Sequence, residues 1–163
     1  MKLSGDYIAG LVDGEGCFSL RCYTEVKRHR QRKPTYFRWQ VEFVIVLRED
    51  DIQLLQSVQD TIGCGTITRS QGTVRYSVRG INELNSVIIP FFKKHPLYGK
   101  KKADFELWSE AVKILHGHNF KGVNIREGSR GFIENPWIQD ELDKLQELHH
   151  KIVCHKTNRV TTV

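Results

Sequence analysis

The chain has 163 residues and carries 25 Lys or Arg against 19 Asp or Glu, which gives a formal net charge of +6 at pH 7. This length is typical of one domain with a sizeable buried core, so we expect a single domain over residues 1–163. No apolar run is long enough to span a bilayer, and the first residues lack the apolar stretch of a secretory signal, so the sequence favours neither a membrane protein nor a secreted one. The four cysteines lack the spacing of a disulfide framework, which favours reduced thiols and an intracellular location, cytoplasmic or organellar.

The positive charge is concentrated in one segment. Residues 21–38 contain seven Lys or Arg and one Glu, and the rest of the chain is close to neutral. A basic block on a neutral body favours a polyanionic partner, of which nucleic acid is the commonest. On charge alone, a solvated surface loop is the alternative.

The first predicted element is a helix over residues 7–16. Gly10 and Gly14 lie on one side of it, and Ser4 or Asp6 is expected to cap its start. Two glycines inside a helix cost about 1 kcal/mol each relative to alanine, and close approach of a second helix would offset that cost. Because the decapeptide occurs once in the chain, that second helix would come from another subunit related by a two-fold axis. Glu15 would then face its symmetry mate, and a divalent ion such as Mg²⁺ would relieve the repulsion between the two carboxylates.

Two hairpins follow this helix. Alternation predicts strands over residues 17–23 and 36–47, joined by a basic connection, and over residues 66–70 and 73–79, joined by a short turn. An amphipathic helix over residues 50–62 separates the hairpins. Each strand has an apolar face, which we expect to meet the core, and a polar face whose side chains suit contacts with base edges and phosphates. An ordinary solvated sheet face would also be polar.

The rest of the chain is predicted to be mainly helical. An apolar helix covers residues 81–92, with Pro90 able to kink or end it, and a long helix covers residues 100–115. Residues 117–135 are expected to form a loop, and residues 136–153 a final amphipathic helix. The domain would therefore consist of a core over about residues 1–116 and a C-terminal loop and helix over about residues 117–163.

The decapeptide Tyr-Ile-Ala-Gly-Leu-Val-Asp-Gly-Glu-Gly resembles the LAGLIDADG motif of homing endonucleases. Glu15 takes the acidic eighth place, and five positions match the motif letter for letter: Ala9, Gly10, Leu11, Asp13 and Gly16. The predicted order of elements is similar to the core of that family over about the first 115 residues. The resemblance implies an α+β fold with an α-β-β-α-β-β-α core, an antiparallel saddle-shaped sheet and extra C-terminal helices.

The resemblance also implies a catalytic site. Glu15 would be the principal metal ligand, with the carbonyl of Gly14 beside it. Mg²⁺ is the expected cofactor, and Mn²⁺ or Ca²⁺ could occupy the same site. The lysine of the family pattern falls on Lys101, which would lie near the scissile phosphate. The neighbouring Lys100 and Lys102 leave this assignment open by one residue, and a solvated lysine run is the alternative.

One motif per chain implies a homodimer that binds double-stranded DNA. The motif helices would meet through Ile8, Ala9, Gly10, Asp13 and Gly14. Many relatives carry a glutamine where this chain has Arg48, which would supply a basic group to the catalytic site. A larger set of side chains would contact DNA, mainly in the major groove: Arg21, Tyr23, Lys27, Arg28, Arg30, Arg32, Lys33, Arg38, Gln40, Glu42, Ser70, Arg75, Ser77 and Arg79.

These expectations together indicate a Mg²⁺-dependent homing endonuclease, a hydrolase that makes staggered double-strand breaks at a long, roughly palindromic DNA site. One alternative is a maturase that uses the same scaffold to bind intron RNA and help it splice. Another is a sequence-specific DNA-binding regulator without nuclease activity. The presence of Glu15 argues against the regulator, because a repulsive carboxylate pair at the dimer axis would serve no purpose there.

Overall fold

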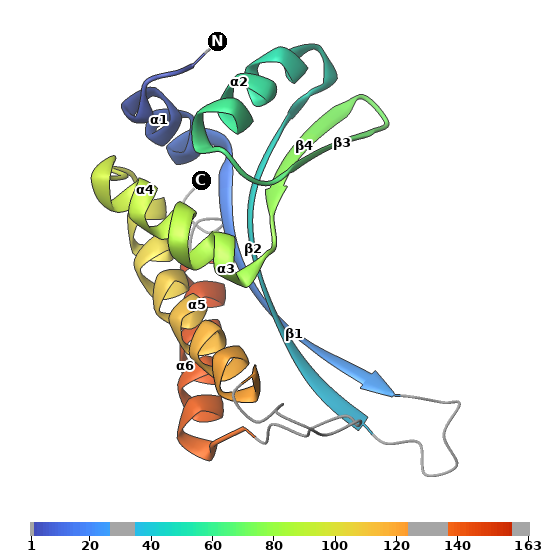
Figure 1. Ribbon diagram of the computed structural model, residues 1–163, viewed down its shortest axis with the longest axis vertical. Coiled ribbons are helices and arrows are strands. Elements are labelled where there is room, and N and C mark those ends of the chain that lie inside the picture. Colours follow the sequence, from blue (N-terminus) through green and yellow to red (C-terminus); the bar gives the residue numbers. More distant parts are fainter. Residues whose placement is uncertain (1, 27–34, 124–136, 158–163) are drawn as a thin grey trace.

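A four-stranded antiparallel sheet forms the centre of the fold, and the described helices cover one of its faces (Figure 1). The computed structural model describes residues 2–26, 35–123 and 137–157. The strands are β1 (Gly16–Val26), β2 (Thr35–Arg48), β3 (Thr66–Ser70) and β4 (Thr73–Val78), in the spatial order β1-β2-β4-β3. The helical segments are α1 (Gly5–Glu15), a 3₁₀ turn (Glu49–Asp51), α2 (Ile52–Ile62), α3 (Ile81–Glu83), a π-helical turn (Leu84–Ile88), α4 (Ile89–Lys94), α5 (Lys101–Val123) and α6 (Gln139–Thr157). This order confirms the predicted α-β-β-α-β-β-α core and the additional C-terminal helix.

The first helix begins and ends as the sequence predicts. Ser4 is the N-cap, and its Oγ accepts a hydrogen bond of 3.2 Å from the amide of Tyr7. Ile8 and Val12 are fully buried and attach the helix to the core. The chain enters β1 directly at Gly16, where a Cβ would lie 2.5 Å from the side chain of Val12. Only glycine allows so abrupt a change from helix to strand at this position.

The β1–β2 hairpin is longer than the rest of the sheet. Its strands pair from Gly16↔Ile45 out to Val26↔Thr35, whereas β4 pairs with β2 only from Phe43 to Arg48. The outer half of the hairpin therefore extends past β3 and β4. Helix α6 lies behind it, where the rings of His149 and Trp39 meet edge to face with centroids 5.9 Å apart.

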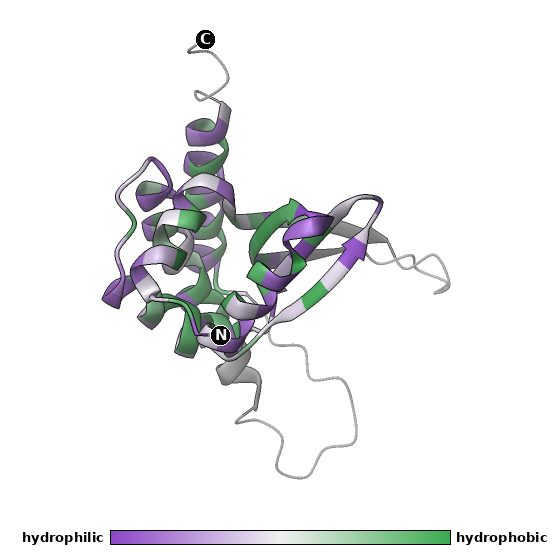
Figure 2. Ribbon diagram, turned by 90° about the horizontal axis from the view of Figure 1, so that it is seen from above, coloured by the Kyte–Doolittle hydropathy of each residue, from purple (hydrophilic) through white to green (hydrophobic). Residues whose placement is uncertain are grey.

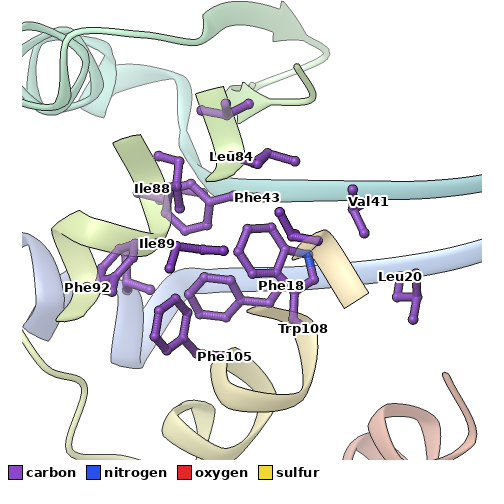
Figure 3. Close-up of a cluster of buried hydrophobic side chains, with 14 of the residues drawn as sticks. Phe18, Leu20, Val41, Phe43, Leu84, Ile88, Ile89, Phe92, Phe105 and Trp108 are labelled. Atoms are coloured by element: carbon purple, nitrogen blue, oxygen red, sulfur yellow. The ribbon is translucent and has the colours of Figure 1, made fainter. Parts of the chain in front are cut away.

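Aromatic side chains from both layers meet in the core (Figure 3). Phe18 of β1 contacts Phe43 of β2 at a centroid distance of 5.2 Å and Trp108 of α5 at 5.1 Å, and Phe92 and Phe105 complete the cluster. Burial of each such ring stabilises the fold by roughly 1.5–3 kcal/mol. The indole of Trp108 also donates a hydrogen bond of 3.2 Å to the carbonyl of Ser19, which fixes α5 against β1.

Three predictions about the helices are wrong. Pro90 neither ends nor interrupts the helical path, since a π-helical turn precedes it and it lies in the first turn of α4, where a missing amide costs little. Gly117 does not begin a loop, because α5 continues through it to Val123. His118, in this added part of α5, lies with its Nδ1 3.6 Å from the carboxylate of Glu141 in α6. The final helix runs over residues 139–157 rather than 136–153.

Hydrophobic and hydrophilic residues are interspersed along the helices (Figure 2). Among the residues that the structure describes, no helix is both long and apolar enough to cross a membrane.

Candidate active site and nucleic-acid interface

The C-terminal end of α1 brings together an acidic and a basic side chain from distant parts of the sequence. Glu15 is the last residue of α1 and is exposed. The ammonium of Lys101, at the start of α5, donates a hydrogen bond of 2.5 Å to the carbonyl oxygen of Gly14, 87 positions away in the sequence. A cation at this place is favoured because the C-terminal end of a helix carries partial negative charge. We call Gly14, Glu15 and Lys101 the catalytic corner.

The segment that leads to Lys101 is held against α1 by two acidic side chains. Asp13 Oδ2 accepts hydrogen bonds from the amides of Tyr98 and Gly99, at 2.9 and 3.1 Å. Asp6 Oδ1 lies 2.8 Å from Nδ1 of His95, near the start of the same helix. A Cβ at position 99 would lie 3.0 Å from Asp13 Oδ1, so a small residue suits this contact. The position of Lys101 is thus set by the main chain before it and by its own bond to Gly14.

The catalytic corner offers oxygen ligands to a hard divalent cation. The carboxylate of Glu15 and the carbonyl of Gly14 are the ligand types that Mg²⁺ and Ca²⁺ prefer. The carbonyl oxygen of Gly14 already accepts a hydrogen bond from the positively charged Lys101 ammonium, so a cation can reach this oxygen. Within the described part of the chain, no three His, Cys, Asp or Glu residues group closely enough to hold a metal.

One side of α1 carries glycines and an exposed tyrosine. Among the described residues, a Cβ placed at Gly10 or Gly14 would meet no atom outside the backbone of its own helix within 4 Å, and Tyr7 is 51% exposed. The expectation that Ile8 and Ala9 belong to this face is corrected, because both are buried in the core of the chain itself. The carboxylate of Asp13 is bound to the main chain of residues 98 and 99, and its expected place at the subunit interface stays a prediction.

The sheet face opposite the helices gathers most of the predicted DNA-contacting side chains. Strand register places Arg21 across from Gln40, and Arg75 across from Thr68. Side chains two residues apart point to the same face of a sheet, so this face continues over all four strands. We call it the open face, and its predicted contact residues with described side chains are Arg21, Tyr23, Gln40, Glu42, Ser70, Arg75, Ser77 and Arg79.

Glu42 differs from the other residues of the open face because it is only 4% exposed. Its Oε1 accepts a hydrogen bond of 2.6 Å from Nε of Arg79, and its Oε2 accepts one of 2.8 Å from Nη2 of Arg75. Burial raises the pKa of the carboxyl, but the two arginines outweigh that effect and the net pKa lies below its usual value. The expectation of a direct DNA contact by Glu42 is therefore corrected. Ser77, only 7% exposed, is likewise covered on this face.

Arg48 also lies on the open face by register, at the end of β2 and across from Thr73. Its side chain is 83% exposed and pairs with Asp50 at 2.9 Å, and its expected role at the catalytic site stays a prediction. Lys27, Arg28, Arg30, Arg32 and Lys33, and the side chain of Arg38, lie outside the described residues.

Some open-face residues were not among the predicted contacts. Thr66, Thr68 and Val46 share the face with Ser77 and Arg75 by register. The alternation of strands β2 and β3 carried the signal for these positions. No sequence signal indicated that Asp13 binds the segment before α5.

A sequence profile of the LAGLIDADG endonuclease family matches residues 8–112, which contain the catalytic corner and the whole sheet. The chain belongs to this family. A probable intron-encoded endonuclease of Neurospora crassa is 37% identical over 111 residues, a match that covers 66% of this LAGLIDADG chain and 20% of the relative. The chain thus spans about a fifth of the length of that relative.

Solved structures have the same fold. The homing endonuclease I-TnaI matches with a TM-score of 0.67 at 24% identity, and the match covers 97% of this chain and 99% of that one. I-SmaMI, bound to an uncleaved DNA target in the presence of calcium ions, matches with a TM-score of 0.71 at 22% identity, over 93% of this chain and 45% of that one. The LAGLIDADG fold therefore occurs in chains of about this size and in chains about twice as long.

Proposed function

We propose that this LAGLIDADG chain is a subunit of a homing endonuclease that makes staggered double-strand breaks at a long, roughly palindromic DNA site. The observation that carries the proposal is the catalytic corner, where Lys101 bonds the Gly14 carbonyl beside the exposed Glu15 carboxylate. Family membership and the relatives named as intron-encoded endonucleases support DNA cleavage as the reaction.

A second copy of the chain is the proposed source of the second motif helix. The face of α1 around Gly10 and Gly14 is open, and the decapeptide occurs once in the sequence. Pairing two such helices would offset the helix-propensity cost of both glycines. It would also bring two Glu15 carboxylates and two Lys101 ammonium groups to the two-fold axis, one set for each DNA strand.

The proposed cofactor is a divalent metal ion, Mg²⁺ foremost, with Mn²⁺ or Ca²⁺ able to bind the same oxygens. Glu15 and the Gly14 carbonyl would hold it, and a bound ion of this kind activates water and stabilises the charge of a phosphodiester under attack. Lys101 would place its positive charge beside the same phosphate. Asp13 would keep this lysine in place through Tyr98 and Gly99.

The open face is the proposed DNA-binding surface. It presents Arg21, Tyr23, Gln40 and Arg79 as donors and acceptors that match base edges in the major groove. The basic residues 27–33 would then contact phosphates at the end of the hairpin. Arg48 would add charge at the opposite end of β2. We place the protein inside the cell, where its DNA target is.

Cleavage of a pooled double-stranded DNA library tests the proposal. We expect the purified protein to cut a specific subset of sequences with Mg²⁺, to stop cutting in EDTA, and to lose cutting but not binding in Glu15→Gln. Specific binding without cutting in Mg²⁺, Mn²⁺ or Ca²⁺ would contradict the nuclease and favour a DNA-binding regulator. Tighter binding to intron RNA than to any DNA in the library would favour the maturase.

A further inference from the structure

Two arginines of the open face share one buried carboxylate. Arg79 Nε and Arg75 Nη2 bind the two oxygens of Glu42 at 2.6 and 2.8 Å. A carboxylate that is only 4% exposed is costly to bury unless it is paired in this way. Glu42 is therefore ionised and fully engaged by its two partners, and the cluster of three side chains keeps one net positive charge.

The two arginines are not equivalent within this cluster. Phe43 pairs with Val78, so Glu42 lies across from position 79, while Arg75 lies across from Val46, four residues away. Arg75 must extend back along β4 to reach the carboxylate, and its side chain is only 35% exposed. Arg79 lies directly beside Glu42, and its side chain is 61% exposed.

The bond to Glu42 leaves the outer end of Arg79 available. Within the described residues, Arg79 donates to Glu42 through Nε alone. Its Nη1 and Nη2 groups therefore form a planar pair of donors, or fork, for another ligand. In the major groove, O6 and N7 of guanine form the pair of acceptors that such a fork matches best. A fork fixed in advance loses less side-chain entropy on binding than a free arginine does.

We propose that Arg79 reads a guanine in each half of the DNA target and that Glu42 is the positioning residue that holds its guanidinium for this contact. The inference rests on the proposed function, because it requires the open face to lie in the major groove. Arg75 completes the cluster by balancing the Glu42 charge.

Base preference measured by selection of bound sequences from a randomised duplex library, in EDTA to prevent cutting, tests this inference. Wild type is expected to prefer guanine about tenfold or more at one position of each half-site. Arg79→Lys keeps the charge but removes the fork, so it should lower the preference at that position alone.

Glu42→Gln separates positioning from simple support of the fold. The substitution should lower the same guanine preference while strengthening binding to unrelated DNA, because the open face gains one net positive charge. A structural loss would instead weaken both kinds of binding. Glu106→Gln, on the exposed side of α5, makes the same change in charge away from the open face and should keep the preference.

The inference is overturned if Arg79→Lys leaves the preference at every position unchanged, or if Glu42→Gln weakens all sequences equally. Should Glu42→Gln fail to fold, Arg79→Lys alone decides the result. If wild type selects no sequence at all, both this inference and the proposed function fail. If it selects a site but Arg79→Lys changes nothing, only this inference fails.

Discussion

The catalytic corner and the open face are held in place by different kinds of contact. At the corner, Lys101 bonds a main-chain carbonyl and Asp13 bonds main-chain amides, so the arrangement follows from the path of the backbone. On the open face, the side chain of Glu42 holds the side chains of two arginines. One or two side-chain substitutions are therefore enough to change what the open face binds. The catalytic corner, in contrast, is preserved as long as the backbone keeps its fold.

The largest effect on the cleavage rate is expected at Lys101, and it would separate the role of the catalytic corner from that of the open face. Lys101→Met should reduce the rate of cleavage on the order of 100-fold with little change in DNA affinity, because it removes a charge next to the reacting phosphate. Single-turnover cleavage rates measure this effect. Lys102→Met, one residue further along α5 on an exposed position, is the matched control. Equal losses in both variants would mean that the lysines act only as a general positive field.

The next effect concerns the side of α1 that carries Gly10 and Gly14. Gly10→Ala should stabilise an isolated subunit by up to about 1 kcal/mol, because alanine favours a helix over glycine and nothing lies near its Cβ. The same methyl group should weaken association about tenfold or more, since it separates the paired helices. Sedimentation equilibrium measures association. Gly117→Ala in α5, where a Cβ is equally unhindered, should stabilise the chain without affecting association.

A smaller effect is expected at Asp13. Asp13→Asn should cost about 1.5–3 kcal/mol of stability, because the amides of Tyr98 and Gly99 lose a charged acceptor. Cleavage should fall about tenfold, since the segment before Lys101 loosens. Chemical denaturation and single-turnover rates measure the two effects. Asp6→Asn removes the other, exposed contact to this segment and should cost less than about 1 kcal/mol. A larger loss of cleavage in Asp6→Asn would contradict the role given to Asp13.

The smallest effect is a pH dependence of the free energy of unfolding, caused by the ion pairs of Glu42 on the open face. The pKa of Glu42 is lowered in the folded chain, so its pairing contributes stability above the unfolded pKa of about 4.5 and loses it as pH falls through the folded pKa. We expect Glu42→Gln to be about 1–2 kcal/mol less stable than wild type near neutral pH, and this difference to shrink below about pH 4.5. Urea unfolding at several pH values measures it. A difference that is independent of pH would contradict the ion pairing.

Local patterns predicted most of the fold. Strands 66–70 and 73–78 follow from alternation and from the turn at Gly72, and the motif helix ends where the decapeptide indicates. The length of α5 could not be predicted, because a glycine such as Gly117 costs only about 1 kcal/mol inside a helix and the contacts of α5 with α6 are not visible in the local sequence. The helix propensity of a residue describes only the free energy of placing it in an isolated helix and contains no information about contacts with a neighbouring helix.

Sequence patterns select Glu15, Gly14 and Lys101, and the fold brings Lys101 onto the carbonyl of Gly14, next to Glu15 in the chain. Their catalytic role stays a prediction. The bonds of Asp13 to the amides of Tyr98 and Gly99 could not be predicted, because these partners lie more than 80 positions away in the sequence. Alternation placed Glu42 on the correct face of the sheet, but it could not reveal that two arginines cover its carboxylate.

The most direct test of the division between catalytic corner and open face compares three proteins on one randomised DNA library: wild type, Glu15→Gln and Arg79→Lys. Binding in EDTA and cutting in Mg²⁺ are read from the same pool. We expect Glu15→Gln to bind the sequences that wild type selects without cutting them, and Arg79→Lys to cut with a relaxed preference at one position of each half-site. Loss of sequence preference in Glu15→Gln, or loss of all cutting in Arg79→Lys, would contradict the separation of reading from cleavage.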